Sequence, residues 1–348
     1  MRHGASTLGA VVKLTVYRDS SVFKQLEPEW NDLLHQSTSD TIFCTWEWQS
    51  TWWDAYQAGD LLIATCRTDD GRLVGIGSWF IETSNGERVV RTIGCVDVTD
   101  YVDIIAHRDF IEPVASALAS VLLEHRAEYD RVNLCNIPEA SPTLPTLPDR
   151  LKELGFNVEV VFQEVCPVIH LPDDWETYLS LLDKKQRHEL RRKVRRAESE
   201  AQINWYRVDA SHDFDEELER FLQLMRSSHP EKARFLDNPK NLAFFHKIAP
   251  IVFRCGWLRL SFLVIDGVPS ATYFDFDYNG RILVYNSGLL PESHAHLSPG
   301  IVLLSYNIRH AIEKKRAVFD FLRGNEIYKY RMGGQDTKVF KLKAQIPA

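Results

Sequence analysis

Alternating apolar and polar positions predict two sets of strands, each followed by an amphipathic helix and one more strand. In the C-terminal set, strands flank a turn at Asp266–Gly267 and a second turn at Asn279–Gly280. Such Asx-Gly pairs between alternating segments are typical of two-residue hairpins. Helical spacing then begins at residues 298–300 (Ser-Pro-Gly) and ends near Lys315, and residues 317–322 have the pattern of a short strand.

The same order occurs nearer the N-terminus. Asp70–Gly71 matches Asp266–Gly267 at an offset of 196 residues, and Asn85–Gly86 matches Asn279–Gly280 at an offset of 194. A helix predicted from Phe110 and a strand from Arg131 complete the earlier set. Two copies of one strand–strand–strand–helix–strand unit indicate an internal duplication.

The remaining pattern predicts further elements by period and by turn residues. Strands are expected at 13–18, 61–68, 72–82, 88–93, 157–170 and 201–208, and helices at 23–36, 43–56 (capped by Thr45), 147–154, 214–225 and 241–253. The segment 94–103 is expected to be a loop. Pro138–Pro148 contains four prolines and is predicted to be a connector without regular structure.

Between the two copies, Asp173–Glu198 is predicted to be one long helix with Asp173 as its cap. This helix would contain an apolar stripe at helical spacing and, in its second half, the basic run Lys184–Arg196. That run holds eight Lys or Arg and one Glu, so it carries +7 and the rest of the 348-residue chain carries −14. Such a run is either a solvated face or a site for a partner that bears phosphate.

Composition indicates an ordinary globular protein with 45% hydrophobic residues and a net charge of −7, which gives no indication of DNA binding. No apolar run approaches the roughly 18 residues that a membrane helix requires, and we expect no signal peptide. Six scattered cysteines without a Cys-x-x-Cys motif predict reduced thiols and a cytoplasmic location. The fragment His294-Ala-His296 has no obvious third ligand, so no metal site is expected.

Ser298-Pro-Gly300 suits the start of a helix, because Ser can cap, Pro fits the first turn and Gly lets a ligand approach the backbone. A helix start directs unpaired N–H groups and the positive end of the dipole outward, which favours phosphate. The simpler alternative is that these three residues only begin a helix well.

Several motifs together carry a family resemblance. Ser298-Pro-Gly300 with Leu303-Leu304, then Phe319–Glu326 and Tyr328-Lys329, is similar to the closing motif of acetyltransferases associated with cellulose and other exopolysaccharide biosynthesis. Phe43, Trp46 and Trp52-Trp53 resemble the N-terminal signature of the same family. The chain thus resembles the branch of GNAT-type acetyltransferases that is close to the Fem-type aminoacyltransferases.

This resemblance implies an α/β fold of two GNAT-like repeats, each a mixed sheet flanked by helices, joined by a long basic helix. The expected parts are an extension at 1–12, an N-terminal repeat at 13–170, the linker helix at 171–199 and a C-terminal repeat at 200–348 that binds the acyl donor. Two parallel strands would splay apart, with the donor's pantetheine arm along 282–288, the strand at 318–322 as the other wall, and pyrophosphate near Gly300.

The resemblance also implies roles for single residues. Proton transfer and charge stabilisation fall to Tyr328, Asp320, Glu326 and Lys329, with Tyr330 as a second candidate proton donor and Arg331 as a further cation. Acetyl- or acyl-coenzyme A would contact Tyr285, Asn286, Ser287, Ser298, Gly300 and Arg323. The sequence departs from the usual GNAT pyrophosphate loop, because only Gly300 remains of several glycines, which keeps other acyl donors open.

In the first copy, Asp97, Asp100, Tyr101 and Asp103 follow a strand and are expected to bind the acceptor. Clustered carboxylates can bind an amine or sugar hydroxyls, although turn capping would explain them equally well.

The sequence therefore predicts a cytoplasmic acyltransferase acting on an amino or hydroxyl group of a small molecule or of a glycan or cell-envelope precursor. Two alternatives stay open. One is a Fem-type peptidyltransferase that uses aminoacyl-tRNA, which the basic helix favours and the acidic remainder opposes. The other is a non-catalytic binding protein of the same fold.

Overall fold

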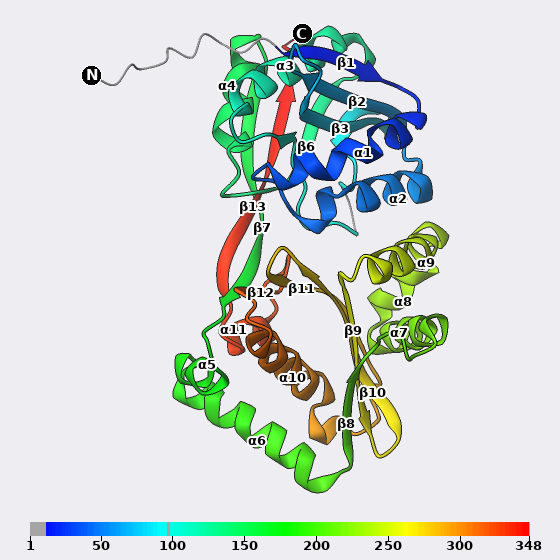
Figure 1. The fold of residues 1–348 in the computed structure, drawn as a ribbon, viewed down its shortest axis with the longest axis vertical. Helices are drawn as coiled ribbons and strands as arrows, with labels where there is room; N and C mark the ends of the chain where they lie inside the picture. Colours follow the sequence, from blue (N-terminus) through cyan, green and yellow to red (C-terminus); the bar gives the residue numbers. More distant parts are fainter. Residues whose placement is uncertain (1–11, 96–97, 348) are drawn as a thin grey trace, which may run out of the picture. The chain divides into compact units, whose positions relative to one another are not determined.

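The structure is a computed structural model that describes residues 12–95 and 98–347. Two compact units are present (Figure 1). One comprises Met1–Glu164 with Lys338–Ala348, and the other comprises Val165–Thr337. Strands β7 (Asn157–His170) and β13 (Gln335–Gln345) contribute residues to both units. The expected division into GNAT-like domains at 13–170 and 200–348 stays a prediction.

The first unit is a mixed sheet with strand order β1-β2-β3-β4-β6-β13-β7 and helices on both faces. Besides the segments of β7 and β13, its elements are β1 (Lys13–Tyr17), α1 (Ser21–His35), α2 (Trp46–Tyr56), β2 (Asp60–Arg67), β3 (Leu73–Ser84), β4 (Glu87–Thr92), β5 (Ile105–Ala106), α3 (Ile111–Glu124), β6 (Arg131–Pro138) and α4 (Thr143–Glu153). Helices α3 and α4 pack their apolar residues on strands β2, β3 and β6. As predicted, Thr45 caps α2 by accepting from the N–H of Trp48.

The second unit is a mixed sheet with strand order β7-β12-β11-β10-β9-β8. Its other elements are α5 (Trp175–Leu181), α6 (Lys184–Glu200), β8 (Ile203–Arg207), α7 (Phe214–Ser228), α8 (Pro230–Asp237), α9 (Pro239–Arg254), β9 (Leu258–Ile265), β10 (Val268–Tyr278), β11 (Arg281–Leu289), α10 (Pro299–Glu313), β12 (Val318–Asp320) and α11 (Ile327–Arg331). Helices α7 to α9 cover one face of the sheet, and α10, with α6 beside it, covers the other (Figure 1).

Each unit has three antiparallel strands, a helix, and a strand that returns parallel to the third. In the first unit β4 and β6 are the parallel pair, with Val89 opposite Arg131. In the second unit β11 and β12 are the parallel pair, with Arg281 opposite Val318. The predicted repeat of one GNAT-like strand and helix order is therefore confirmed in the fold.

The hairpin turns have the backbone that their residues favour. The φ angles are 50° and 81° at Asp266–Gly267 and 48° and 71° at Asn279–Gly280. Two-residue turns with positive φ at both positions match the twist of the flanking strands, and Asn, Asp and Gly adopt such angles at low cost. Local sequence thus sets the two turns, and shifts at Pro269/Ala271 and Phe274/Asp275 change the register farther along the strands.

Three predictions about the segments between strands are wrong. Asp174, not Asp173, caps the first linker helix, and the chain breaks at Asp183, whose carboxylate caps α6. The expected single helix is therefore two. Helix α4 begins inside the proline-rich segment, because Pro145 lies in the first turn, where backbone N–H groups have no helical partner. Helix α8 and strand β13 were not predicted at all.

The prediction of six reduced thiols is wrong for Cys95 and Cys135, which form a disulfide. Cys95 follows β4 and Cys135 lies in β6, and these two strands run parallel side by side. Their Cα atoms lie 5.9 Å apart, a separation that a disulfide spans. The other four cysteines form no disulfide in the described part of the chain. Among the described residues, no helix is both long and apolar enough to span a membrane.

We predict that Gly288→Ala destabilises the protein because helix α7 packs directly on this strand. A Cβ at position 288 would lie 2.4 Å from the backbone nitrogen of Met225, which cannot move aside cheaply. The free energy of unfolding should fall by about 1–3 kcal/mol, measured by denaturant titration. Gly300→Ala is the matched control, because its Cβ would meet nothing closer than 3.8 Å. Equal stability of the two variants would contradict this packing.

Candidate functional site

Strands β11 and β12 separate after a short region of pairing. Strand β12 pairs with β11 only at Arg281, Ile282 and Leu283, whereas β11 continues to Leu289. The register with β10 shifts beyond this point, and Tyr285 is the extra residue, because Asp275 lies opposite Val284 and Phe274 opposite Asn286. Residues 284–289, the part of β11 that β12 does not pair, therefore have one backbone edge to which β12 adds no strand. An extended molecule could bind along this edge.

Helix α10 begins beside this edge with its N-terminus uncapped. Ser298 is the cap residue, but its side chain makes no capping hydrogen bond, so the expected cap is wrong. Its φ of 56° is left-handed and directs the side chain away from the helix axis. The Cβ direction of Gly300 is open except for Leu289 at 3.8 Å, and the first turn holds no acidic residue. The N–H of Gly300 thus remains available to an anion, because Pro299 has no N–H and the N–H groups of Ile301 and Val302 donate to the Ser298 carbonyl.

The corresponding helix of the first unit has the opposite electrostatics. Asp109 precedes α3, and Glu112 lies in its first turn, where it pairs with Arg150 at 3.0 Å. Carboxylates at this end already complement the helix dipole and would repel a phosphate. Of these two corresponding helices, α10 begins without a carboxylate and α3 begins with one.

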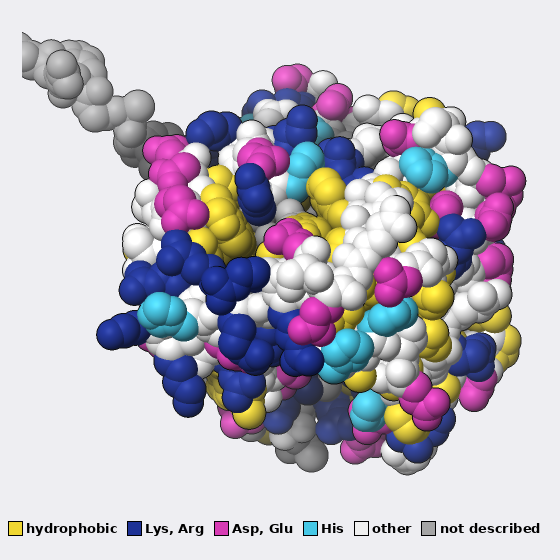
Figure 2. Space-filling view, turned by 90° about the horizontal axis from the view of Figure 1, so that it is seen from below, with side chains coloured by type: hydrophobic (Ala, Val, Ile, Leu, Met, Phe, Trp, Pro, Cys, Tyr) yellow, Lys and Arg dark blue, Asp and Glu magenta, His cyan; other side chains and the backbone are white. Residues whose placement is uncertain are grey.

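A groove of about 580 Å³ runs beside the start of α10, between α6 and α11. It is lined by Lys185, Gln186, His188, Glu189, Leu190, Arg192, Lys193, Ile301, Tyr328, Arg331 and Met332. Four of these are Lys or Arg, and the one acid, Glu189, already pairs with Arg192 at 2.8 Å. Figure 2 shows Lys and Arg side chains gathered on this side of the second unit. The groove therefore attracts anions.

Tyr328 reaches this groove from α11 with a hydroxyl that keeps its proton. Burial raises the pKa of Tyr328 above its usual value, and the carboxyl groups of Glu326 and Asp275 add to the shift. A phenol in this state can donate a hydrogen bond to a departing sulfur and can pass it a proton as the C–S bond breaks. Tyr330, the other candidate donor, is exposed and donates to Asp336 at 2.9 Å.

Lys329 is fully buried and its ammonium group is saturated. It donates to the carbonyl oxygens of Leu322, Arg323 and Gly324 at 3.3, 2.7 and 3.1 Å, and it pairs with Glu326 at 2.9 Å. The geometry favours a role in holding the turn after β12 rather than the predicted contact with the substrate. Asp320 is also buried and accepts from the N–H of Leu322 at 2.8 Å. Arg323 and Glu326 lie on this same turn.

Lys232 was not predicted as a site residue. It lies beside the part of β11 that β12 does not pair. It extends from α8, and its ammonium group donates to the carbonyl oxygen of Ser287 at 2.5 Å and to the Ser287 hydroxyl at 3.1 Å. Burial lowers the pKa of Lys232 to about 8, against the opposing effect of Glu326. No pattern around Lys232 marks it, because α8 itself was not predicted.

The two residues before Ser287 in β11 differ in the surroundings of their side chains. The ring of Tyr285 lies 5.0 Å from that of Phe276 and 6.0 Å from that of Phe245, so its side chain belongs to the aromatic core under α9. Asn286 is half-buried. Both the carbonyl and the hydroxyl of Ser287 accept from Lys232.

The predicted acceptor residues of the first unit are only partly described. Asp97 lies outside the described residues. Tyr101 is buried with its ring 6.2 Å from that of Phe43, and Asp100 is half-buried. Asp103 is buried and accepts from Ser141, from Ser39 at 3.3 Å and from its neighbour's N–H. Burial raises the pKa of Asp103 to about 6 although these hydrogen bonds oppose it. Asp103 thus fixes its own loop.

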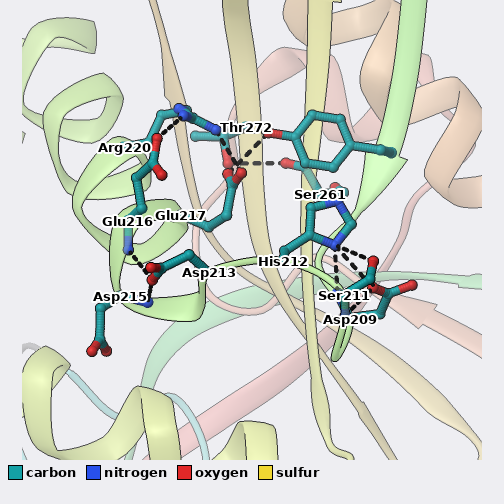
Figure 3. A network of polar contacts seen from close by, with 11 residues as sticks. Asp209, Ser211, His212, Asp213, Asp215, Glu216, Glu217, Arg220, Ser261 and Thr272 are labelled. Carbon is teal, nitrogen blue, oxygen red and sulfur yellow. Dashed lines mark hydrogen bonds and ion pairs between the residues drawn. The ribbon is translucent and has the colours of Figure 1, made fainter.

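A Ser–His–Asp group near the start of α7 is not a catalytic triad. Ser211, His212 and Asp209 point at one another, and both the serine hydroxyl and the carboxylate approach the same imidazole nitrogen, Nδ1 (Figure 3). A triad needs one partner on each ring nitrogen. In the same view Arg220 bridges Glu216 and Glu217, which fastens the helix.

Comparison with known proteins places this geometry in context. Residues 184–330 match the family model described as an acetyltransferase (GNAT) domain. The structure is similar to crystal structures of FemX (12% identity, TM-score 0.65, 90% of this chain and 95% of that chain) and of L-PGS from Bacillus licheniformis (11%, 0.53, 92% and 92%). It is also similar to a tandem GNAT protein from the clavulanic acid biosynthesis pathway (13%, 0.51, 97% and 100%). No curated protein matches the chain in sequence. The fold is thus that of GNAT-like repeats.

We predict that Lys329→Met lowers the free energy of unfolding by about 2–4 kcal/mol, because three carbonyl groups and Glu326 lose a buried charged partner. Denaturant unfolding of the full chain measures this. The exposed Lys24→Met should change stability by less than about 0.5 kcal/mol. If Lys329→Met were as stable as the wild type, the structural role of this lysine would be wrong.

Proposed function

We propose that the protein is an acyltransferase that binds acyl-coenzyme A in its second unit and passes the acyl group to an amino or hydroxyl acceptor. The observation that carries the proposal is the separation of β11 from β12 beside the uncapped start of α10. An extended amide-containing arm can pair with residues 284–289, while its phosphates meet the Gly300 N–H at the positive end of α10. The GNAT match over residues 184–330 supports the same reading.

The cationic groove beside α10 is the proposed binding site for the phosphate groups of the donor. Coenzyme A carries a pyrophosphate and a further phosphate, and Lys185, Arg192 and Arg331 line the groove next to Ile301 of α10. A volume of about 580 Å³ lies within the usual range of ligand sites. The missing glycines of the usual pyrophosphate loop do not prevent this contact, because Gly300 leaves the first turn open.

Acyl transfer then needs two proton movements. The acceptor loses a proton as it attacks the thioester carbonyl, and Tyr328 donates its phenolic proton to the thiolate that leaves. Glu326, which is exposed on the turn beside Tyr328, is the proposed group for the acceptor's proton. The acceptor itself is proposed to be a sugar or another cell-envelope precursor, on the strength of the family resemblance, with Asp100 and Tyr101 as proposed contacts. Exopolysaccharide biosynthesis remains the proposed setting.

A cytoplasmic location stays a prediction as well. The Cys95–Cys135 disulfide weighs against it, because structural disulfides are uncommon in reducing compartments.

Binding of acetyl-coenzyme A provides the test. A ligand at about one hundred times its dissociation constant should add roughly 2.7 kcal/mol of apparent stability, measured by thermal unfolding. Gly300→Trp should abolish this gain, because the indole would cover the helix start. Glu112→Trp, at the same position of α3, should leave it intact. A gain that survives in Gly300→Trp would contradict the proposed site, and no gain in the wild type would contradict coenzyme A as donor.

A second candidate donor is aminoacyl-tRNA, which one feature of α6 favours. Lys184, Lys185, Arg187 and Arg195 have no acidic partner within the described part of the chain. A row of free cations on one helix suits a phosphate backbone.

If this donor is used, tRNA binding should weaken steeply with salt, and the double variant Lys184→Gln, Arg195→Gln should reduce the slope of log K against log salt by about 1–2. Lys314→Gln, Lys315→Gln is the control, with unchanged charge on α6. Filter binding over a salt series measures the slope. Affinity that does not depend on salt would rule out tRNA as the donor.

A further inference from the structure

The ammonium group of Lys232 occupies a distinctive place in the second unit. Beyond Leu283 the edge of β11 has no partner in β12, and the carbonyl of Ser287 on this stretch accepts from Lys232 instead. Strand register supports this direction. Gly288 lies opposite Thr272 and the N–H of Leu290 donates to Ser270, so these two alternate residues bond to β10. Ser287, one residue before Gly288, is therefore turned to the other edge of β11. The Ser287 carbonyl thus faces the side where β12 has separated.

Lys232 therefore lies along the edge that the proposed acyl donor would follow. Lys232 belongs to α8. This helix lies on one face of the sheet, and α10 lies on the other (Figure 1). A donor whose phosphates lie at α10 and whose arm follows residues 284–289 passes the Ser287 carbonyl and the Nζ atom of Lys232 that is bonded to it. An amine placed at a thioester carbonyl reacts with a large proximity advantage over free lysines.

The chemistry of this amine suits such a reaction. Burial lowers the pKa of Lys232 to about 8, so a substantial fraction is neutral and nucleophilic near that pH. The carboxylate of Glu326 is near enough to influence the lysine, and Tyr328 on the same side retains a proton for the leaving group.

We propose that Lys232 is a site of self-acylation, in which the bound acyl-coenzyme A transfers its acyl group to the Nζ atom of this lysine when no acceptor is present. This inference rests on the proposed function. The neutral amine attacks the thioester carbonyl, a C–N bond forms and the C–S bond breaks. The nitrogen gives up one proton to Glu326 or water, and the thiolate takes one from Tyr328. The products are an amide on Lys232 and free coenzyme A thiol.

Acylation would change the site in two ways. The amide has no positive charge, and it adds bulk along the edge of residues 284–289, so a second donor molecule would be excluded. The enzyme would thereby limit consumption of its own donor when the acceptor is scarce.

Peptide mass spectrometry of the full chain, incubated with acetyl-coenzyme A alone, tests the inference. We expect Lys232 to gain an acetyl group at least about tenfold faster than Lys315, which also donates to a backbone carbonyl but is exposed. Free coenzyme A in excess should suppress acetylation of Lys232 and leave Lys315 unaffected. Gly300→Trp should have the same selective effect, and the competition experiment covers the case in which that variant does not fold.

The possible failures are distinguishable. If acetyl-coenzyme A stabilises the protein but Lys232 reacts no faster than Lys315, the self-acylation is wrong and the proposed function stands. If Lys232 reacts quickly but neither coenzyme A nor Gly300→Trp slows it, the reaction is ordinary solution chemistry and the inference is overturned. If acetyl-coenzyme A does not bind, the proposed function and this inference fall together.

Discussion

The pairing of β12 with β11 ends after three residues, and the chemistry available to the second unit depends on that limit. A sheet edge inside a protein normally satisfies its backbone groups with the next strand. Here residues 284–289 lack that strand, the extra residue Tyr285 bends β11, and Gly288 allows α7 to support the bent strand from one face. Hydrogen-bonding groups are thereby kept available where helix α10 begins.

Electrostatics then distinguishes two copies that share one topology. Helix α3 begins with carboxylates and helix α10 without any, and the groove beside α10 is cationic. The first unit also links Cys95 to Cys135 at its parallel strands and commits Asp103 to internal hydrogen bonds. The duplicated fold thus has a helix start without carboxylates in one copy and with carboxylates in the other.

Much of the fold could be predicted from the sequence because its determinants are local. Asx-Gly turns set the hairpins, and the period of apolar residues marked nearly every strand and helix. The failures have physical causes. Strand β13 is mostly polar, so its period is weak, and α4 holds Pro145 in its first turn and Pro148 in its interior, although prolines are typical of a connector. The pairing of Cys95 with Cys135 depends on β4 and β6 being neighbours in the sheet. No local sequence pattern indicates which strands are neighbours.

The site was less predictable, since it depends on where side chains meet. Tyr328 and Gly300 were found through motifs, and both lie where a donor would bind. Lys329 belongs to the same motif, yet its ammonium group is consumed by three carbonyls of its own turn. Lys232 is 55 residues from Ser287 in the chain, and only the packing of α8 brings them together.

The most direct measurement of the central claim is amide hydrogen exchange of the full chain with and without acetyl-coenzyme A. We expect slower exchange in peptides that cover residues 284–289 and the first turn of α10, because N–H groups there would gain hydrogen-bond partners in the donor. Peptides that cover β4 and the first turn of α3 should exchange as before. Protection confined to α3, or spread equally over both helix starts, would contradict the claim that only the second copy binds the donor.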